Sequence, residues 1–152
     1  MRAFSKLKHH IFNAFREIFI YNHNSLLFRA KLFALLVGVD NEEHDNDYYI
    51  NLRSTAIKIY NDEDRADLLV LTTKEIVRKI RKSNEFNIDK LIESVVQELK
   101  EIPRYAKKID KESLSSLLEV ADDEETKIYQ NRIIEFLDNL KAETYAKHNL
   151  TD

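Results

Sequence analysis

The chain of 152 residues contains no cysteine, one glycine and one proline. Without cysteine it can form neither disulfides nor zinc–thiolate sites, and thiol catalysis is excluded. Turn-rich β-sandwiches and barrels use glycine and proline often, so their scarcity argues strongly against a β architecture. The single glycine, Gly38, falls inside a helical pattern, which rules out a glycine-rich phosphate-binding loop.

The chain also lacks a long apolar stretch. Its longest apolar run, residues 32–39, is far shorter than the roughly 20 residues that a membrane span needs. Residues 1–20 carry scattered basic side chains and do not read as a secretory signal, so we expect a cytoplasmic protein. With 43% hydrophobic and 34% charged residues the composition is globular. We expect one domain over residues 1–145 and a frayed polar tail over residues 146–152.

Apolar residues recur at spacings of three and four along most of the chain, which is typical of amphipathic helices. The pattern predicts helices over residues 3–20, 25–39, 48–60, 62–81, 88–101, 103–120 and 123–145. The single proline, Pro103, suits the first position of a helix, and we expect that helix to bend near Asp110. We therefore expect an all-α fold, a compact bundle of six or seven helices.

One stretch of sequence occurs twice. Residues 35–43 resemble residues 117–125, 82 positions later, and each is an apolar stretch that runs into a group of acidic residues. This repetition predicts two pseudo-repeated helix–acidic loop–helix halves, with residues 35–39 and 117–121 both helical. If the halves are equivalent, Asp40→Ala and Asp122→Ala should each cost about 1 kcal/mol of stability through lost capping bonds.

Both acidic groups, residues 40–47 and 122–125, offer carboxylates that a hard cation such as Ca²⁺ or Mg²⁺ would accept as ligands. Neither is an EF-hand, because the central glycine and the glutamate at the twelfth position of the calcium loop are missing. The favoured interpretation is that these acids cap helix N-termini and line solvated turns, and cation binding is the alternative.

The layout of residues 31–40 and 117–122, with the segment 88–99 and Pro103 between them, resembles the TerB-like family of tellurite-resistance proteins over about residues 26–142. The resemblance implies a non-enzymatic module in a stress response, acting as a scaffold or through metal binding. The family's acidic residues fall here on Asp40 and Asp122, with Glu43 and Glu125 beside them. The family usually has Asp-Gly at both turns, and here Asn41 and Asp123 stand in place of the glycines. Asn and Asp are the non-glycine residues that tolerate left-handed backbone best.

Three further features have two interpretations each. His44, inside the first acidic group, is expected to be an inert exposed loop residue, with a metal or pH role as the alternative. The basic run 78–82 is expected to complement the C-terminal end of its helix rather than bind nucleic acid, so no nucleic-acid partner is expected. Tyr48 and Tyr49 are expected to contribute packing, with the rim of a pocket as the alternative.

Charge is unevenly distributed along the chain. Residues 1–32 hold six basic residues against one acidic residue, a balance of +5, whereas residues 33–152 carry −8. Residues 1–20 form a basic amphipathic helix whose apolar stripe must be covered. We expect it to pack on the domain. Its basic side chains could also contact an anionic membrane surface or another protein. The candidate interaction residues are Arg2, Lys6, Lys8 and Arg16.

No catalytic motif can be recognised, so we expect no enzyme. The function most consistent with the sequence is a non-enzymatic, TerB-like interaction or regulatory module with a protein partner, and cation sensing through its acidic loops is one form of that role. The alternative is a peripheral protein that binds the inner face of the membrane, or another anionic surface, through its N-terminal helix.

Overall fold

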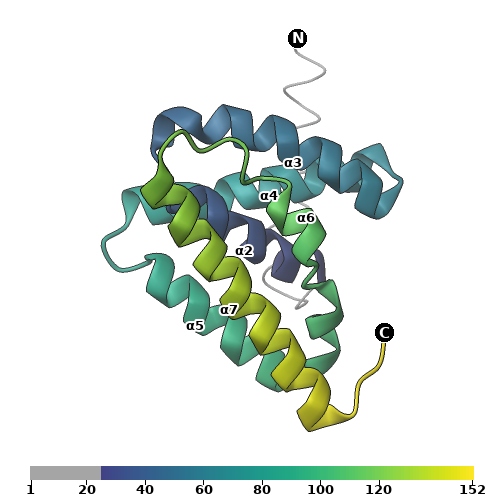
Figure 1. Cartoon of the computed structure of the whole chain (residues 1–152). Coiled ribbons are helices and arrows are strands. Elements are labelled where there is room, and N and C mark those ends of the chain that lie inside the picture. Colours follow the sequence, from purple (N-terminus) through teal and green to yellow (C-terminus); the bar gives the residue numbers. More distant parts are fainter. Residues whose placement is uncertain (1–24) are drawn as a thin grey trace.

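The computed structural model describes residues 25–152, and every regular element in this range is helical. Six α-helices and two short 3₁₀-helices, labelled η, follow one another in the order α2 (Ser25–Gly38), η1 (Glu42–His44), α3 (Asp45–Tyr60), α4 (Glu63–Lys82), α5 (Ile88–Glu101), η2 (Pro103–Lys108), α6 (Lys111–Ser115) and α7 (Glu124–His148). The predicted all-α bundle is confirmed (Figure 1). The predicted helix of residues 1–20, and its interaction residues, lie outside the described range.

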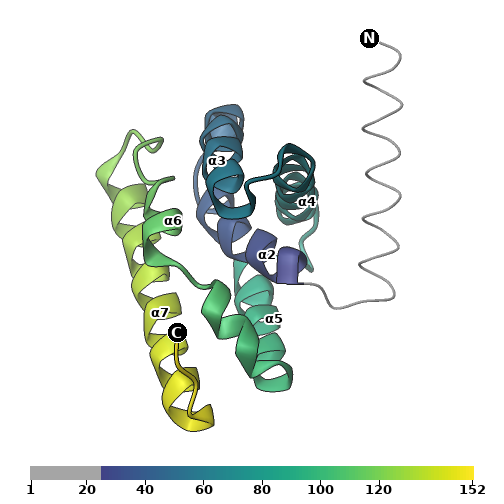
Figure 2. The same ribbon diagram turned by 90° about the vertical axis from the view of Figure 1, so that its right-hand side faces the viewer.

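Helix α2 forms the centre of the bundle. Ten of its 14 residues are buried, from Leu26 to Val37, because nearly the whole sequence of the helix is apolar. In Figure 2, α4 and α7 lie on opposite sides of it. A Cβ atom on Gly38, at the end of α2, would lie 3.0 Å from Ile88 Cδ1 and 3.2 Å from Ile80 Cδ1. The glycine therefore lets α4 and α5 approach the end of α2 closely.

Side-chain caps explain where three helices begin. Asp62 accepts hydrogen bonds from Asp64 N and Arg65 N at the start of α4. Asn87 accepts one from Lys90 N at the start of α5, and Asp123 accepts one from Thr126 N at the start of α7. These bonds satisfy backbone N–H groups that have no partner inside the helix. The predicted bounds of α4 and α5 agree closely with the structure.

The predicted duplication is wrong in its second half. Residues 103–120 do not form one helix, because η2 and the five-residue α6 replace it and residues 116–120 form turns. Residues 117–121 therefore lie outside a helix, whereas residues 35–38 lie inside α2. What the two regions share is narrower than a repeated unit: each is an acidic loop that leads into a helix.

The C-terminal end of the chain is more ordered than its sequence suggested. Helix α7 continues past Tyr145 to His148, where Asn149 ends it in a left-handed conformation with φ of 54°. The amide of Leu150 donates to Tyr145 O at 2.9 Å, and the Tyr145 hydroxyl lies 2.5 Å from a carboxylate oxygen of Asp152. These bonds close the last turn of the helix, so the expected fraying over residues 146–152 does not begin at Tyr145.

Candidate functional site

Asp40 is the centre of a buried polar cluster at the end of α2. Only 3% of its side chain is exposed. Its carboxylate accepts a hydrogen bond from Asn41 N at 2.6 Å and one from the Tyr48 hydroxyl at 2.5 Å, and it lies 3.1 Å from His44 Nδ1. A buried carboxylate is costly unless its oxygens are hydrogen-bonded, and here three donors surround it. Asp40 therefore fixes the turn between α2 and α3.

His44 joins the two acidic loops. Its Nδ1 lies 3.1 Å from Asp40 Oδ2, and its Nε2 lies 3.1 Å from Asp122 Oδ2. A carboxylate only accepts hydrogen bonds, so a ring that satisfies both partners carries a hydrogen on each nitrogen and is positively charged. The hydrogen bond to Asp40 is the largest cause that raises the pKa of His44 above its ordinary 6.5, and partial burial opposes it. The carboxylates of Asp122 and Glu43 raise it further.

The prediction that His44 is an inert, exposed loop residue is wrong, because 18% of its side chain is exposed and both ring nitrogens have partners. Of the two alternative roles, the structure favours the pH role, because both ring nitrogens face carboxylates and the pKa of His44 is raised. A metal role has no support within residues 25–152. No local sequence signal distinguishes the two, since the second partner, Asp122, lies 78 residues away.

Tyr48 and Gln130 extend the cluster into the core. The hydroxyl of Tyr48 donates to Asp40 and accepts a hydrogen bond from Gln130 Nε2 at 2.8 Å. The same amide donates to Leu36 O at 2.9 Å, so α7 is tied to both α2 and α3. Burial first, and the bond to Asp40 second, raise the pKa of Tyr48 well above its ordinary 10.0. Tyr48 therefore remains a donor at neutral pH and belongs to the core rather than to a pocket rim.

Arg81, near the end of α4, satisfies the C-terminal end of α2. Its guanidinium donates to the carbonyl oxygens of Val37, Gly38 and Asp40, at distances between 2.9 and 3.3 Å. It also forms an ion pair with Asp45 at 2.6 Å. Helix C-termini leave carbonyl groups without intrahelical partners and carry partial negative charge, so a guanidinium fits here. The run 78–82 was expected to complement the end of its own helix, whereas Arg81 complements the end of α2.

The four predicted cation ligands do not gather around one point. Asp40 and Asp122 are separated by the ring of His44. Glu43 accepts a hydrogen bond from Asn41 Nδ2 at 3.2 Å, and Glu125 lines a pocket on α7. Within residues 25–152, no group of three or more His, Asp or Glu side chains is arranged to hold a metal ion. The predicted Ca²⁺ or Mg²⁺ site therefore has no support in the described part of the chain.

Asn41 and Asp123, for which the sequence resemblance predicted left-handed backbone, do not adopt it. Asn41 has φ of −66° and Asp123 has φ of −104°, and both serve as extended N-cap residues. Between residues 25 and 152, only Asn61 and Asn149 are non-glycine residues with positive φ. The favoured capping interpretation therefore holds for the second loop, where Asp123 caps α7, whereas in the first loop Asn41 caps η1 and no side chain caps α3.

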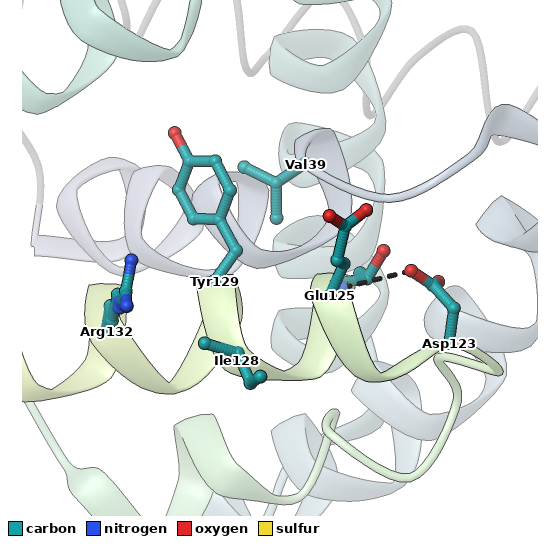
Figure 3. A pocket seen from close by; sticks show the side chains of 7 residues that line it. Val39, Asp123, Glu125, Ile128, Tyr129 and Arg132 are labelled. Atoms are coloured by element: carbon teal, nitrogen blue, oxygen red, sulfur yellow. Dashed lines mark hydrogen bonds between the residues drawn. The ribbon is translucent and has the colours of Figure 1, made fainter.

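A surface pocket of about 640 Å³ lies between the end of α2 and the first turns of α7. Its apolar lining comes from Val39, Ile128 and Tyr129, and Figure 3 shows the ring of Tyr129 beside Val39. Charged residues line it as well, namely Asp123, Glu125 and Arg132. The pocket is open, and it lies directly beside the loop that His44 holds.

Helix α7 exposes three large apolar side chains on its outer surface. Ile128 is 50% exposed, Tyr129 is 48% exposed and Phe136 is 42% exposed. Together with Glu125 and Arg132 they occupy one side of the helix, and we call these five residues the α7 face. The apolar spacing along residues 123–145 predicts that Ile128 is buried in one stripe with Ile133 and Ile134, and the structure shows that this prediction is wrong for Ile128. A helix with apolar residues on both sides gives no simple signal in sequence of which side faces the core.

Comparison of the chain with protein-family models, with curated proteins and with solved structures finds no match. None of the helices in residues 25–152 is long and apolar enough to cross a membrane.

Proposed function

We propose that this protein is a non-enzymatic interaction module that receives a protein partner on the α7 face. The observation that carries the proposal is the coincidence of an open pocket with three exposed large apolar side chains on one helix. Scattered exposed apolar residues are normal on a protein surface, whereas a contiguous group beside a pocket marks an interaction site. Aromatic residues and arginine, represented here by Tyr129, Phe136 and Arg132, are the types enriched in such sites.

The polar cluster supports this proposal by fixing the start of α7. Gln130 ties the first turns of the helix to Leu36 O and Tyr48, and His44 holds the preceding loop through Asp122. Side chains held on a rigid element lose little freedom when they bind, which lowers the cost of association. In this proposal the cluster positions the α7 face and does no chemistry of its own.

The resemblance to the TerB-like family extends the proposal to a regulatory role in a stress response, of which tellurite resistance is the family's example. The support for this extension is the layout of the sequence around residues 31–40 and 88–99. Sensing of a cation is not part of the proposal, because His44 stands between Asp40 and Asp122.

Photo-crosslinking in the cells that naturally make the protein would test the proposal. A photoreactive phenylalanine analogue placed at Tyr129 or Phe136 should give a covalent adduct of one defined mass, which mass spectrometry would identify. The matched control is the same analogue at Asn131, which is exposed on the other side of α7. An adduct found at the face positions, and lost with Arg132→Glu, would support the proposal. Equal adducts at all three positions would contradict it.

A second candidate function is binding to an anionic surface, favoured by the +5 balance of residues 1–32. Binding of this kind weakens as salt screens the charges. The full chain should then sediment with vesicles that contain phosphatidylglycerol, and replacing Lys6, Lys8 and Arg16 with glutamine should abolish it. Vesicles of pure phosphatidylcholine are the control. Absence of salt-sensitive sedimentation would exclude this candidate.

A further inference from the structure

We infer that the partner of the α7 face is a second copy of this chain, bound through an antiparallel pairing of the two α7 helices. The inference rests on the proposed function, because it names the partner of the same surface.

The α7 face is complementary to itself. In a two-fold symmetric pair the same surface meets its own copy, and antiparallel helices bring residues at equal distances from the symmetry axis to the same level. An axis that passes between Ile128 and Tyr129 makes these two residues the apolar centre of the contact. It then places Arg132 level with Glu125 of the partner copy, and Glu125 level with Arg132 of that copy. The contact therefore contains two equivalent ion pairs around an apolar centre.

Neither charge has a partner within the described part of one chain. No ion pair or hydrogen bond of the Glu125 carboxylate or the Arg132 guanidinium occurs in residues 25–152. The two residues are seven positions apart on α7, about 10 Å along the axis, which is too far for an ion pair in the same helix. Two unpaired charges of opposite sign on one helix face, flanking an apolar centre, match the arrangement of a symmetric interface.

The pocket provides room for the second copy. Tyr129 of the partner copy approaches the axis from the opposite direction and reaches the space beside Val39, where about 640 Å³ is open. Phe136 lies farther from the axis and reaches the level of the partner's α6–α7 loop. A basic peptide segment or an anionic surface would leave one of the two charges without a partner, whereas a second copy pairs both.

Sedimentation equilibrium on the full chain would test this inference. The weight-average mass should rise with protein concentration from 18.0 kDa toward twice that value. A single helix pair is a small interface, so a weak, concentration-dependent dimer is expected. Arg132→Glu and Glu125→Arg should each weaken association by about tenfold, because each sets like charges against one another. The double variant carrying both changes should restore it, because the pairs form again with their signs exchanged.

Lys127→Glu is the matched control, since it reverses a charge on the other side of the same helix and should leave the dimer unchanged. Three results would each overturn the inference: a monomer at every concentration, single variants that dimerise as well as the wild type, or a double variant that dimerises no better than the single ones. If the chain remains a monomer while Tyr129 still crosslinks to a different protein, the proposed function stands and this inference fails. If neither Tyr129 nor Phe136 gives a specific crosslink, both the proposed function and this inference fail.

Discussion

The loop that follows α2 and the loop that precedes α7 have similar sequences but different surroundings. In the first, 3% of the Asp40 side chain is exposed, and three donors surround its carboxylate. In the second, 82% of the Asp122 side chain is exposed, and His44 is its partner. The difference arises because α3 and α4 bring Tyr48 and Arg81 to the first loop, whereas the second loop lies at the surface.

This comparison shows that an acidic residue before a helix can have two physical roles. Asp40 is an interior anchor whose hydrogen bonds hold the ends of three helices together. Asp122 is a surface residue that contributes through one exposed ion pair, and such pairs are worth little in water. The sequence predicted equal contributions to stability from the two residues, whereas the structure indicates a large contribution from Asp40 and a small one from Asp122.

The largest expected effect is the difference in stability loss between variants of the two aspartates. Asp40→Ala should lower the free energy of unfolding by about 3 kcal/mol, because it leaves buried donors without an acceptor. Asp122→Ala should lower it by less than about 0.5 kcal/mol. Urea unfolding followed by circular dichroism would measure both changes. Equal losses for the two variants would contradict the unequal roles.

The guanidinium of Arg81 contacts the first loop and not the second, so its removal should have the next largest effect. Arg81→Ala should cost about 2 kcal/mol, because three carbonyl oxygens and Asp45 lose their donor in a mostly buried place. Arg78→Ala, on the exposed side of the same helix, is the matched control and should cost under about 0.5 kcal/mol. Thermal unfolding of both variants would check the difference. Similar melting temperatures would show that Arg81 contributes no more than a surface arginine does.

Gln130 links α7 to the buried cluster around the first loop. Gln130→Leu keeps the volume of the side chain but removes the donor shared by Leu36 O and Tyr48. We expect a loss of about 1–2 kcal/mol, typical of a buried acceptor left without its hydrogen bond. Asn131→Leu, at the neighbouring exposed position, should have almost no effect. A Gln130→Leu protein as stable as the wild type would show that this link between α7 and α2 contributes nothing.

The smallest effect should appear in the pH dependence of stability. The folded protein raises the pKa of His44 above 6.5, so folding favours its protonated form. The resulting stabilisation is fully present below pH 6.5 and is lost as pH rises through the raised pKa. His44→Gln should remove this part of the pH dependence, and His148→Gln is the control. A stability profile that His44→Gln leaves unchanged between pH 6 and 8 would contradict the role of His44 between the two loops.

The sequence predicted the helices with strong periodicity and clear caps. The predicted bounds of α4 and α5 agree with the structure because these helices begin at side-chain caps, Asp62 and Asn87, and a cap is a local signal. The expected bend near Asp110 coincides with the observed break, where residues 109–110 separate η2 from α6. The loss of helix over residues 116–120 was not predicted, because the apolar spacing continues through them. Local propensity cannot show which of two apolar sides of α7 faces the core, and Ile128 was misplaced for that reason.

The candidate site could be predicted only in part. The sequence indicated Asp40, Asp122 and the special position of His44, but not the arrangement that joins them. The polar cluster depends on Arg81 and Gln130, which lie 41 and 90 positions from Asp40. Contacts over such separations are set by how the helices pack. The metal hypothesis counted carboxylates along the chain, whereas the structure places a histidine between two of them.

Amide hydrogen exchange on the full chain, measured by NMR, would test the unequal roles of the two loops most directly. The amide of Asn41 donates to the buried Asp40 carboxylate at 2.6 Å, whereas the amide of Asp122 lies in an exposed loop with no hydrogen bond to a described residue. We predict exchange at least about tenfold slower for Asn41 than for Asp122 once intrinsic rates are removed, and loss of that protection in Asp40→Ala. Equal protection of the two amides in the wild-type protein would contradict the claim that Asp40 anchors the fold and Asp122 does not.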